Sequence, residues 1–220
     1  MQGELSALLN DMTVDSVPPS FEASFQHDRT WQERLLQLFQ AWPRSEPALV
    51  HALSRTLPRE SFVYLGNSLP VREWDLAATR EDRGWTIATN RGANGIDGQL
   101  STFLGMCTEG RANWAMVGDL TALYDLAAPW VVPQLGDVSF SIVVMNNSGG
   151  KIFSRMFDEP LFENRHDVNF ASWAGMWNLH YEKWEQIPAS LPKTQRTVVE
   201  LIPDEEETKQ FWDHYDRLLV

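Results

Sequence analysis

Short apolar runs recur along the chain, and each leads into a polar or glycine turn. Five such runs are present, at residues 62–65, 86–88, 114–117, 140–145 and 197–202. Continuous apolar runs of this length are typical of strands that are buried on both faces, and the helical stretches between them favour parallel pairing. The sequence therefore predicts an α/β fold whose doubly wound, mainly parallel sheet carries helices on both faces.

Helix signals divide the chain near residue 45. An apolar stripe with helical spacing over residues 31–42 stops at Pro43, and Ser45 is expected to cap a new helix. We interpret residues 1–45 as a linker or the tail of a preceding middle domain, and residues 46–220 as one domain.

Further helices are expected between the strands and at the end of the chain. The glycine-rich segment 90–98 leads into a helix that we expect to extend to Gly110, and an acidic helix is expected over residues 205–219. Three tryptophans are expected to pack a helix against the sheet or a neighbouring subunit, namely Trp173, Trp177 and Trp184.

The composition argues against several classes of partner. Lys and Arg number 18 against 30 Asp and Glu, which gives a formal net charge of −12 and disfavours a basic nucleic-acid-binding face. The longest apolar run, 140–145, is far shorter than the ~18–20 residues that span a bilayer. The N-terminus lacks a secretory signal, and the single cysteine, Cys107, fits a reducing compartment. We therefore expect a cytoplasmic protein with no nucleic-acid partner and no membrane span.

Polar or glycine-rich turns follow four of the predicted strands, and open parallel sheets bind ligands at such carboxyl ends. These turns comprise residues 66–68, 90–98, 118–121 and 146–151. Gly92, Gly95 and Gly98 have GxxGxxG spacing rather than the GxGxxG of dinucleotide-binding folds, and no GK[ST] motif occurs. We therefore expect neither a nicotinamide cofactor nor a nucleoside triphosphate.

The pair Asp119 and Asn147 is the most informative feature of these turns. The two residues are 28 positions apart, which leaves room for one helix and one strand and places them on neighbouring strand ends. A carboxylate oxygen, an amide oxygen and a nearby carbonyl suit a hard cation such as Mg²⁺, and Gly149-Gly150 lets the backbone approach a phosphate. The alternative is that Asp119 caps a helix and residues 146–149 form a plain turn.

These residues resemble known motifs. Gly118-Asp119, followed 28 residues later by the second of two asparagines, is similar to the diphosphate-binding motif of thiamine-diphosphate enzymes. Three longer blocks closely resemble the 2-succinyl-5-enolpyruvyl-6-hydroxy-3-cyclohexene-1-carboxylate synthases of menaquinone biosynthesis, at residues 66–72, 90–104 and 146–153. The resemblance extends over residues 28–220 and is sharpest between residues 46 and 153. It implies a thiamine-diphosphate-binding fold, with residues 46–220 as the diphosphate-binding domain.

The resemblance implies roles for individual residues. Asp119 and Asn147 would bind Mg²⁺ or Mn²⁺ through their side chains and Gly149 through its carbonyl, and the metal would bind the cofactor diphosphate. Ile96 would be the apolar wedge that bends the cofactor. The implied cofactor-binding residues are Ser68, Asn94, Ile96, Gly118, Asp119, Leu120, Thr121, Asn147, Gly149, Gly150 and Lys151.

Arg72 and Arg91 are expected to bind substrate carboxylates, with Asn67 beside them. A guanidinium forms two parallel hydrogen bonds to a carboxylate, and an acidic protein needs local positive charge to bind a dicarboxylate and a diphosphate. Both arginines follow predicted strand ends. The alternative is that they lie on the surface or form ion pairs with Glu73, Asp75 or Asp97.

The resemblance implies a transferase that decarboxylates 2-oxoglutarate and adds the resulting carbanion to isochorismate. Cofactor activation in this family depends on a glutamate of an N-terminal pyrimidine-binding domain, and no segment of this chain corresponds to that domain. We therefore expect a chain that is inactive alone, needs that domain from the same or another chain, and forms a homo-oligomer. The alternatives are part of another thiamine-diphosphate decarboxylase, such as an acetolactate-synthase-like enzyme, or a non-catalytic binding module of the same fold.

Overall fold

The computed structural model of this 220-residue chain describes residues 19–220 apart from residues 93, 158, 192–195 and 219–220. The chain divides into two compact units, residues 1–38 and residues 39–220. The described part of the first unit is helical and belongs to helix α2 (Pro19–Ala41). This helix ends two residues before Pro43, as the sequence predicts.

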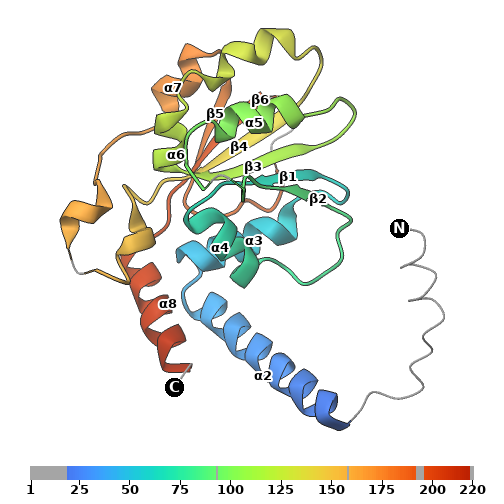
Figure 1. The fold of residues 1–220 in the computed structure, drawn as a ribbon, viewed down its shortest axis with the longest axis vertical. Coiled ribbons are helices and arrows are strands. Elements are labelled where there is room, and N and C mark those ends of the chain that lie inside the picture. Colours follow the sequence, from blue (N-terminus) through green and yellow to red (C-terminus); the bar gives the residue numbers. More distant parts are fainter. Residues whose placement is uncertain (1–18, 93, 158, 192–195, 219–220) are drawn as a thin grey trace, which may run out of the picture. The chain divides into compact units, whose positions relative to one another are not determined.

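One sheet of six parallel strands forms the centre of the second unit (Figure 1). Its strands are β1 (Phe62–Leu65), β2 (Thr86–Ala88), β3 (Asn113–Gly118), β4 (Phe140–Met145), β5 (His180–Trp184) and β6 (Arg196–Leu201). Their order in the sheet is β2-β1-β3-β4-β6-β5, so the chain adds β2 on one side of β1 and then continues on the other side with β3. The predicted doubly wound α/β fold is confirmed.

The described part of the second unit contains α3 (Glu46–Thr56), α4 (Leu69–Ala77), α5 (Gln99–Met106), α6 (Asp119–Tyr124), α7 (Ala171–Met176) and α8 (Glu205–Leu218), with 3₁₀ helices η1 (Ala128–Gln134), η2 (Lys151–Phe153) and η3 (Pro160–Glu163). Several of these helices cover the two faces of the sheet. Figure 1 shows α3 and α4 on one face and α5, α6 and α7 on the other. None of the described helices has the length and apolar character needed to cross a membrane.

Aromatic packing between the sheet and α5 forms the centre of the core. Phe103 of α5 is fully buried. Its ring centroid lies 6.2 Å from that of Phe62 and 6.1 Å from that of Tyr64, both on β1. Phe140 of β4 meets the same ring edge-on at 6.2 Å. Every residue of β1 and β4 is buried, so both faces of these strands are removed from water. The burial of this apolar surface is the main force that drives folding.

Capping residues set the start of α3, as predicted. The Ala48 amide donates a hydrogen bond to the Ser45 hydroxyl at 3.4 Å, and Pro47 lies in the first turn. This start places Glu46 as the first helical residue, with its side chain buried beneath the carboxyl edge of the sheet.

One strand of the sheet, β5, has no counterpart among the predicted elements, and α5 is shorter than the helix predicted there. β5 is an edge strand that pairs only with β6 among the described strands, and its His-Tyr-Glu-Lys-Trp sequence lacks the apolar run of a doubly buried strand. Trp184 therefore lies on a strand rather than on a helix. α5 ends at Met106 instead of Gly110, because Cys107 adopts an extended backbone conformation.

Phe103→Ala is expected to lower the free energy of unfolding by about 3–5 kcal/mol, because it removes a ring that is packed on three others and leaves a cavity. Urea denaturation followed by tryptophan fluorescence measures the change. Tyr124→Ala is the matched control, because that ring is 70% exposed and its loss should change the unfolding free energy by less than about 0.5 kcal/mol. Equal effects of the two changes would contradict this description of the core.

Candidate functional site

The carboxyl ends of β1, β3 and β4 lead into a pocket of about 360 Å³. β3 lies between the other two strands, and Gly118 at its end pairs in register with Met145 at the end of β4. Asp119 and the loop 146–150 therefore leave the sheet side by side. This confirms the predicted placement of Asp119 and Asn147 on neighbouring strand ends. The strand order also reverses here, between β1 and β3, where doubly wound sheets bind ligands.

Most of the residues with a predicted binding role line this pocket. They are Ser68, Arg72, Arg91, Asn94, Ile96, Gly118, Asp119, Leu120, Thr121, Asn147, Gly149, Gly150 and Lys151. Other lining residues had no predicted role, namely Glu46, Leu69, Pro70, Ile152, Phe153, Phe162 and Asn164. The fold thus gathers four separate turns into one cavity, while the roles of the individual residues stay predictions.

Asp119 is buried at the start of α6, where backbone amides hold its carboxylate. Oδ1 accepts a hydrogen bond from the Leu120 amide at 2.6 Å, and Oδ2 accepts one from the Gly149 amide at 2.9 Å. His166 Nε2 lies 3.2 Å from the same Oδ2. Burial still raises the pKa of Asp119, because these groups offset only part of the lost hydration. A divalent cation would supply the missing positive charge, so this carboxylate fits a metal ligand.

Asn147, the second predicted ligand, is oriented by Glu46. Its Nδ2 donates hydrogen bonds to both carboxylate oxygens of Glu46, at 3.1 and 3.0 Å. An ionised carboxylate only accepts, so with Glu46 ionised this contact identifies the nitrogen end of the amide and leaves Oδ1 at the other end. Burial raises the pKa of Glu46 to about 7. Burial and the negative charge of Glu46 raise the pKa of the neighbouring Glu73 well above its ordinary value.

Asn146 is held by a different glutamate. Its Nδ2 donates to Glu200 Oε1 at 2.6 Å, and its Oδ1 accepts from the Ser148 amide at 3.2 Å. Glu200 Oε2, buried on β6, also accepts from the Tyr181 hydroxyl at 2.6 Å and the Phe170 amide at 3.0 Å. Asn146 does not line the pocket. The two adjacent asparagines therefore have separate tasks, one within the loop and one at the pocket.

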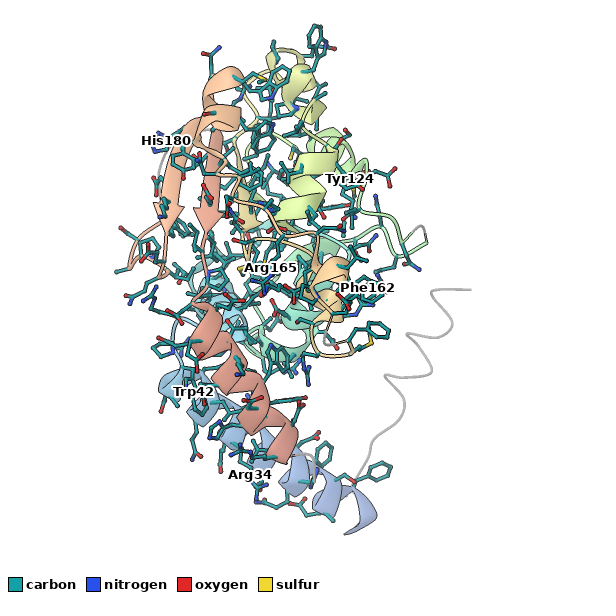
Figure 2. The ribbon with its side chains drawn as sticks, turned by 90° about the vertical axis from the view of Figure 1, so that its left-hand side faces the viewer. Arg34, Trp42, Tyr124, Phe162, Arg165 and His180 are labelled. Atoms are coloured by element: carbon teal, nitrogen blue, oxygen red, sulfur yellow. The ribbon has the colours of Figure 1, made fainter. Side chains whose placement is uncertain are left out.

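Gly149 adopts a backbone conformation that L-residues rarely adopt, with φ of 144°. A Cβ atom here would clash with the carbonyl oxygen of Glu163, which also accepts a hydrogen bond from the Gly150 amide. Because residues 163–165 lie against Gly149, the next residue, His166, is placed beside the Asp119 carboxylate. Figure 2 shows the segment, marked by Phe162 and Arg165, at the end of the sheet to which the strand arrows point.

Arg91 is anchored by Asn67. Arg91 Nη1 donates to Asn67 Oδ1 at 3.0 Å, and Asn67 Nδ2 donates to the carbonyls of Asn90 and Gly95 at 3.2 and 2.8 Å. Gln99 is buried at the start of α5. Its side-chain oxygen accepts a hydrogen bond from the backbone amide of Asn67 at 2.8 Å, and its side-chain nitrogen donates one to the Gly95 carbonyl at 2.6 Å. Asn67 is 1% exposed and does not line the pocket. Its observed contact supports Arg91, and its predicted contact with substrate stays a prediction.

Arg72 lies at the pocket on α4, where its Nη1 donates to the Ser68 carbonyl at 2.6 Å. Among the described residues, no carboxylate forms an ion pair with Arg72 or Arg91, so the alternative pairing with Glu73, Asp75 or Asp97 is not found. Ser68 has φ of 72°, a strained conformation for a residue other than glycine. Strain of this kind is typical of functional sites.

The positive charge of Lys151 is already engaged by two glutamates. Its Nζ lies 2.9 Å from Glu163 Oε2 and 3.0 Å from Glu205 Oε1. The hydrogen bond from Lys151, together with Arg165, lowers the pKa of Glu163. Lys151 lines the pocket, but a bound anion would have to compete with these carboxylates for it.

Apolar side chains contribute much of the remaining wall, and Phe153 and Phe162 lie 6.5 Å apart between ring centroids. Among the described residues, no group of three or more His, Cys, Asp or Glu is placed to hold a metal. A cation beside Asp119 would therefore need amide, carbonyl and ligand oxygens, which is the coordination that Mg²⁺ accepts. The pocket suits a ligand with an anionic end and an apolar or aromatic body.

Comparison with known proteins identifies many relatives, including the two that follow, while no protein-family model matches the chain. A protein of Bdellovibrio bacteriovorus named 2-succinyl-5-enolpyruvyl-6-hydroxy-3-cyclohexene-1-carboxylate synthase is 48% identical over 188 residues, covering 84% of this chain and 36% of that protein. A protein of Akkermansia muciniphila with the same name is 36% identical over 225 residues, covering 94% of this chain and 42% of that protein. The predicted resemblance is confirmed, and the chain spans about two fifths of the length of these relatives.

Gly149→Ala is expected to lower the free energy of unfolding by about 1–3 kcal/mol, because alanine strains the backbone and meets the Glu163 carbonyl. Thermal and urea denaturation measure the loss. Gly105→Ala is the control, because a Cβ there meets no atom within 4 Å and the residue lies within helix α5. If both variants were as stable as the parent, the loop at Gly149 would not pack closely against the Glu163 carbonyl.

The buried pair Glu46 and Glu73 should make the protein less stable as pH rises. Folding raises the pKa of Glu46 from 4.5 to about 7 and raises that of Glu73 well above its ordinary value. The native state therefore keeps protons that the unfolded chain releases above pH 4.5, and the free energy of unfolding falls by at most about 1.4 kcal/mol per pH unit for each group.

Glu73→Gln removes one of these two titrating carboxyls and should flatten that decline. Urea denaturation of the parent and the variant between pH 5 and pH 8 gives the two slopes, in an interval of about three pH units that contains the raised pKa of Glu46. Identical slopes would exclude a raised pKa of Glu73 in the native state.

Proposed function

We propose that this relative of the 2-succinyl-5-enolpyruvyl-6-hydroxy-3-cyclohexene-1-carboxylate synthases forms the diphosphate-binding part of a thiamine-diphosphate-dependent transferase of menaquinone biosynthesis. In this proposal Asp119, Asn147 and the Gly149 carbonyl hold Mg²⁺ or Mn²⁺, which binds the diphosphate of the cofactor. The observation that carries the proposal is the buried Asp119 carboxylate, which lacks full compensation of its charge and lies beside Asn147 in one pocket.

The residues of this chain would position and shield the cofactor. The Leu120 and Gly149 amides hold the Asp119 carboxylate in one orientation, which prepares it for a cation. Ile96 and Phe153 line the same pocket and would exclude water from an apolar ring. Thiamine diphosphate, when bound, supplies the stabilisation of a carbanion that the decarboxylation of a 2-oxo acid requires.

Arg72 and Arg91 would bind the carboxylates of 2-oxoglutarate and isochorismate. Both line the pocket, and neither is neutralised by a carboxylate of the described residues. Two available guanidinium groups favour a dicarboxylate over pyruvate. The names of both relatives also favour this reaction over that of an acetolactate-synthase-like enzyme.

The complete reaction would need residues that this chain does not supply. We place the glutamate that activates the cofactor in a pyrimidine-binding domain of the same or another chain, and we expect a homo-oligomer. The chain covers 36% and 42% of its two relatives, which leaves ample length there for such a domain. In this proposal the chain alone binds the cofactor without turnover.

Asp119→Ala should weaken the Mg²⁺-dependent binding of thiamine diphosphate by about tenfold or more, because the diphosphate loses part of its counter-charge. Calorimetric titration with and without EDTA measures the metal-dependent part of the affinity. Asp75→Ala is the matched control, since it removes an exposed carboxylate from α4.

Two results would refute the proposed site. One is a parent chain that shows no metal-dependent binding at millimolar thiamine diphosphate. The other is an Asp119→Ala variant that binds as tightly as Asp75→Ala.

A further inference from the structure

Among the described residues, two acidic side chains line the pocket, Asp119 and Glu46, and Glu46 is the one that forms hydrogen bonds with the Asn147 side chain. It opens helix α3, lies 101 residues before Asn147 in the chain and is 2% exposed. Burial of a carboxylate is costly unless donors satisfy it, and the Asn147 amide is its donor here. Because burying this carboxylate has a cost, we ask what its contact with Asn147 contributes.

The contact distinguishes the two ends of the Asn147 amide. Nδ2 lies 3.1 and 3.0 Å from the two Glu46 oxygens. With Glu46 ionised, rotating the amide by half a turn would direct Oδ1 at two acceptor oxygens with no hydrogen between them, and such acceptors repel. Glu46 therefore favours one orientation, with Nδ2 toward α3 and Oδ1 away from it.

A hard cation binds an amide through its oxygen, so this orientation decides whether Asn147 can act as a ligand. Among the described residues, Asn147 Oδ1 accepts no hydrogen bond, while Asn147 lines the pocket together with Asp119. The Asp119 carboxylate is held in a similar way by two backbone amides. Contacts within the protein thus orient both predicted side-chain ligands.

We propose that Glu46 is a positioning residue that keeps the side-chain oxygen of Asn147 available to the divalent cation. The inference rests on the proposed function, which supplies the cation. Groups of this kind behind a ligand typically change metal affinity by about 10–100-fold when they are removed.

Glu73 provides an internal comparison. It is as buried as Glu46 and close enough to shift its pKa, yet no hydrogen bond joins its carboxyl to Asn147 among the described contacts. Glu73→Gln perturbs the same buried region beside Glu46 while keeping a side chain of similar size, and Glu46 is expected to remain the acceptor for Asn147 Nδ2. A general effect of altered packing would therefore appear in Glu73 variants as well.

The test is Mn²⁺ binding in the presence of thiamine diphosphate, followed by the electron paramagnetic resonance signal of free Mn²⁺. Glu46→Ala should weaken Mn²⁺ binding by about 10–100-fold, and Glu73→Gln should change it by less than about threefold. Glu46→Gln should fall between them, because one side-chain oxygen can still accept from Asn147. Near-ultraviolet circular dichroism monitors folding, and if Glu46→Ala does not fold, the comparison of Glu46→Gln with Glu73→Gln decides.

The outcomes separate this inference from the proposed function. If the parent binds Mn²⁺, Asp119→Ala loses it and the Glu46 variants match Glu73→Gln, the positioning role is wrong and the proposed function stands. If Glu46→Gln binds as weakly as Glu46→Ala, charge rather than orientation is responsible, and the positioning role is again wrong. If the parent shows no cofactor-dependent Mn²⁺ binding, the proposed function fails and this inference fails with it.

Discussion

The hydrogen bond from the Gly149 amide to the buried Asp119 carboxylate joins the two loops on which the site is built. Parallel pairing of β3 with β4 makes it possible, because Gly118 and Met145 end their strands at the same level. At the same residue the loop meets the segment that follows η3, because a side chain on Gly149 would clash with the Glu163 carbonyl. One contact thus couples the register of the sheet, the conformation of a loop and the orientation of a candidate ligand.

Acidic groups gather at this edge of a protein whose net charge is already −12. Burial raises the pKa of Asp119, Glu46 and Glu73, so the native fold carries a cost that solvent-exposed carboxylates would avoid. A cation would offset part of this cost. Sites that are organised for a ligand commonly reduce stability in its absence, and the local chemistry of this pocket follows that rule.

Most of the pocket could be predicted from the chain because each of its turns follows an apolar run, and parallel strands bring their carboxyl ends together. Other contacts had no local signal. Glu200 of β6 accepts a hydrogen bond from Asn146, and Glu205 of α8 forms an ion pair with Lys151. In each pair the two residues are 54 positions apart in the chain. The edge strand β5 escaped prediction for a related reason, since half-exposed strands lack a continuous apolar run.

Local patterning was sufficient for the succession of buried strands and helices along the chain, apart from the edge strand β5, because apolar periodicity, helix caps and glycine turns act over a few residues. It was also sufficient to place Asp119 and Asn147 at neighbouring strand ends. Packing of α3 under the sheet was needed to bring Glu46 to Asn147 across 101 residues, and with it the direction in which that amide points. Which buried acid meets which amide depends on how distant elements pack, and no short stretch of sequence carries that information.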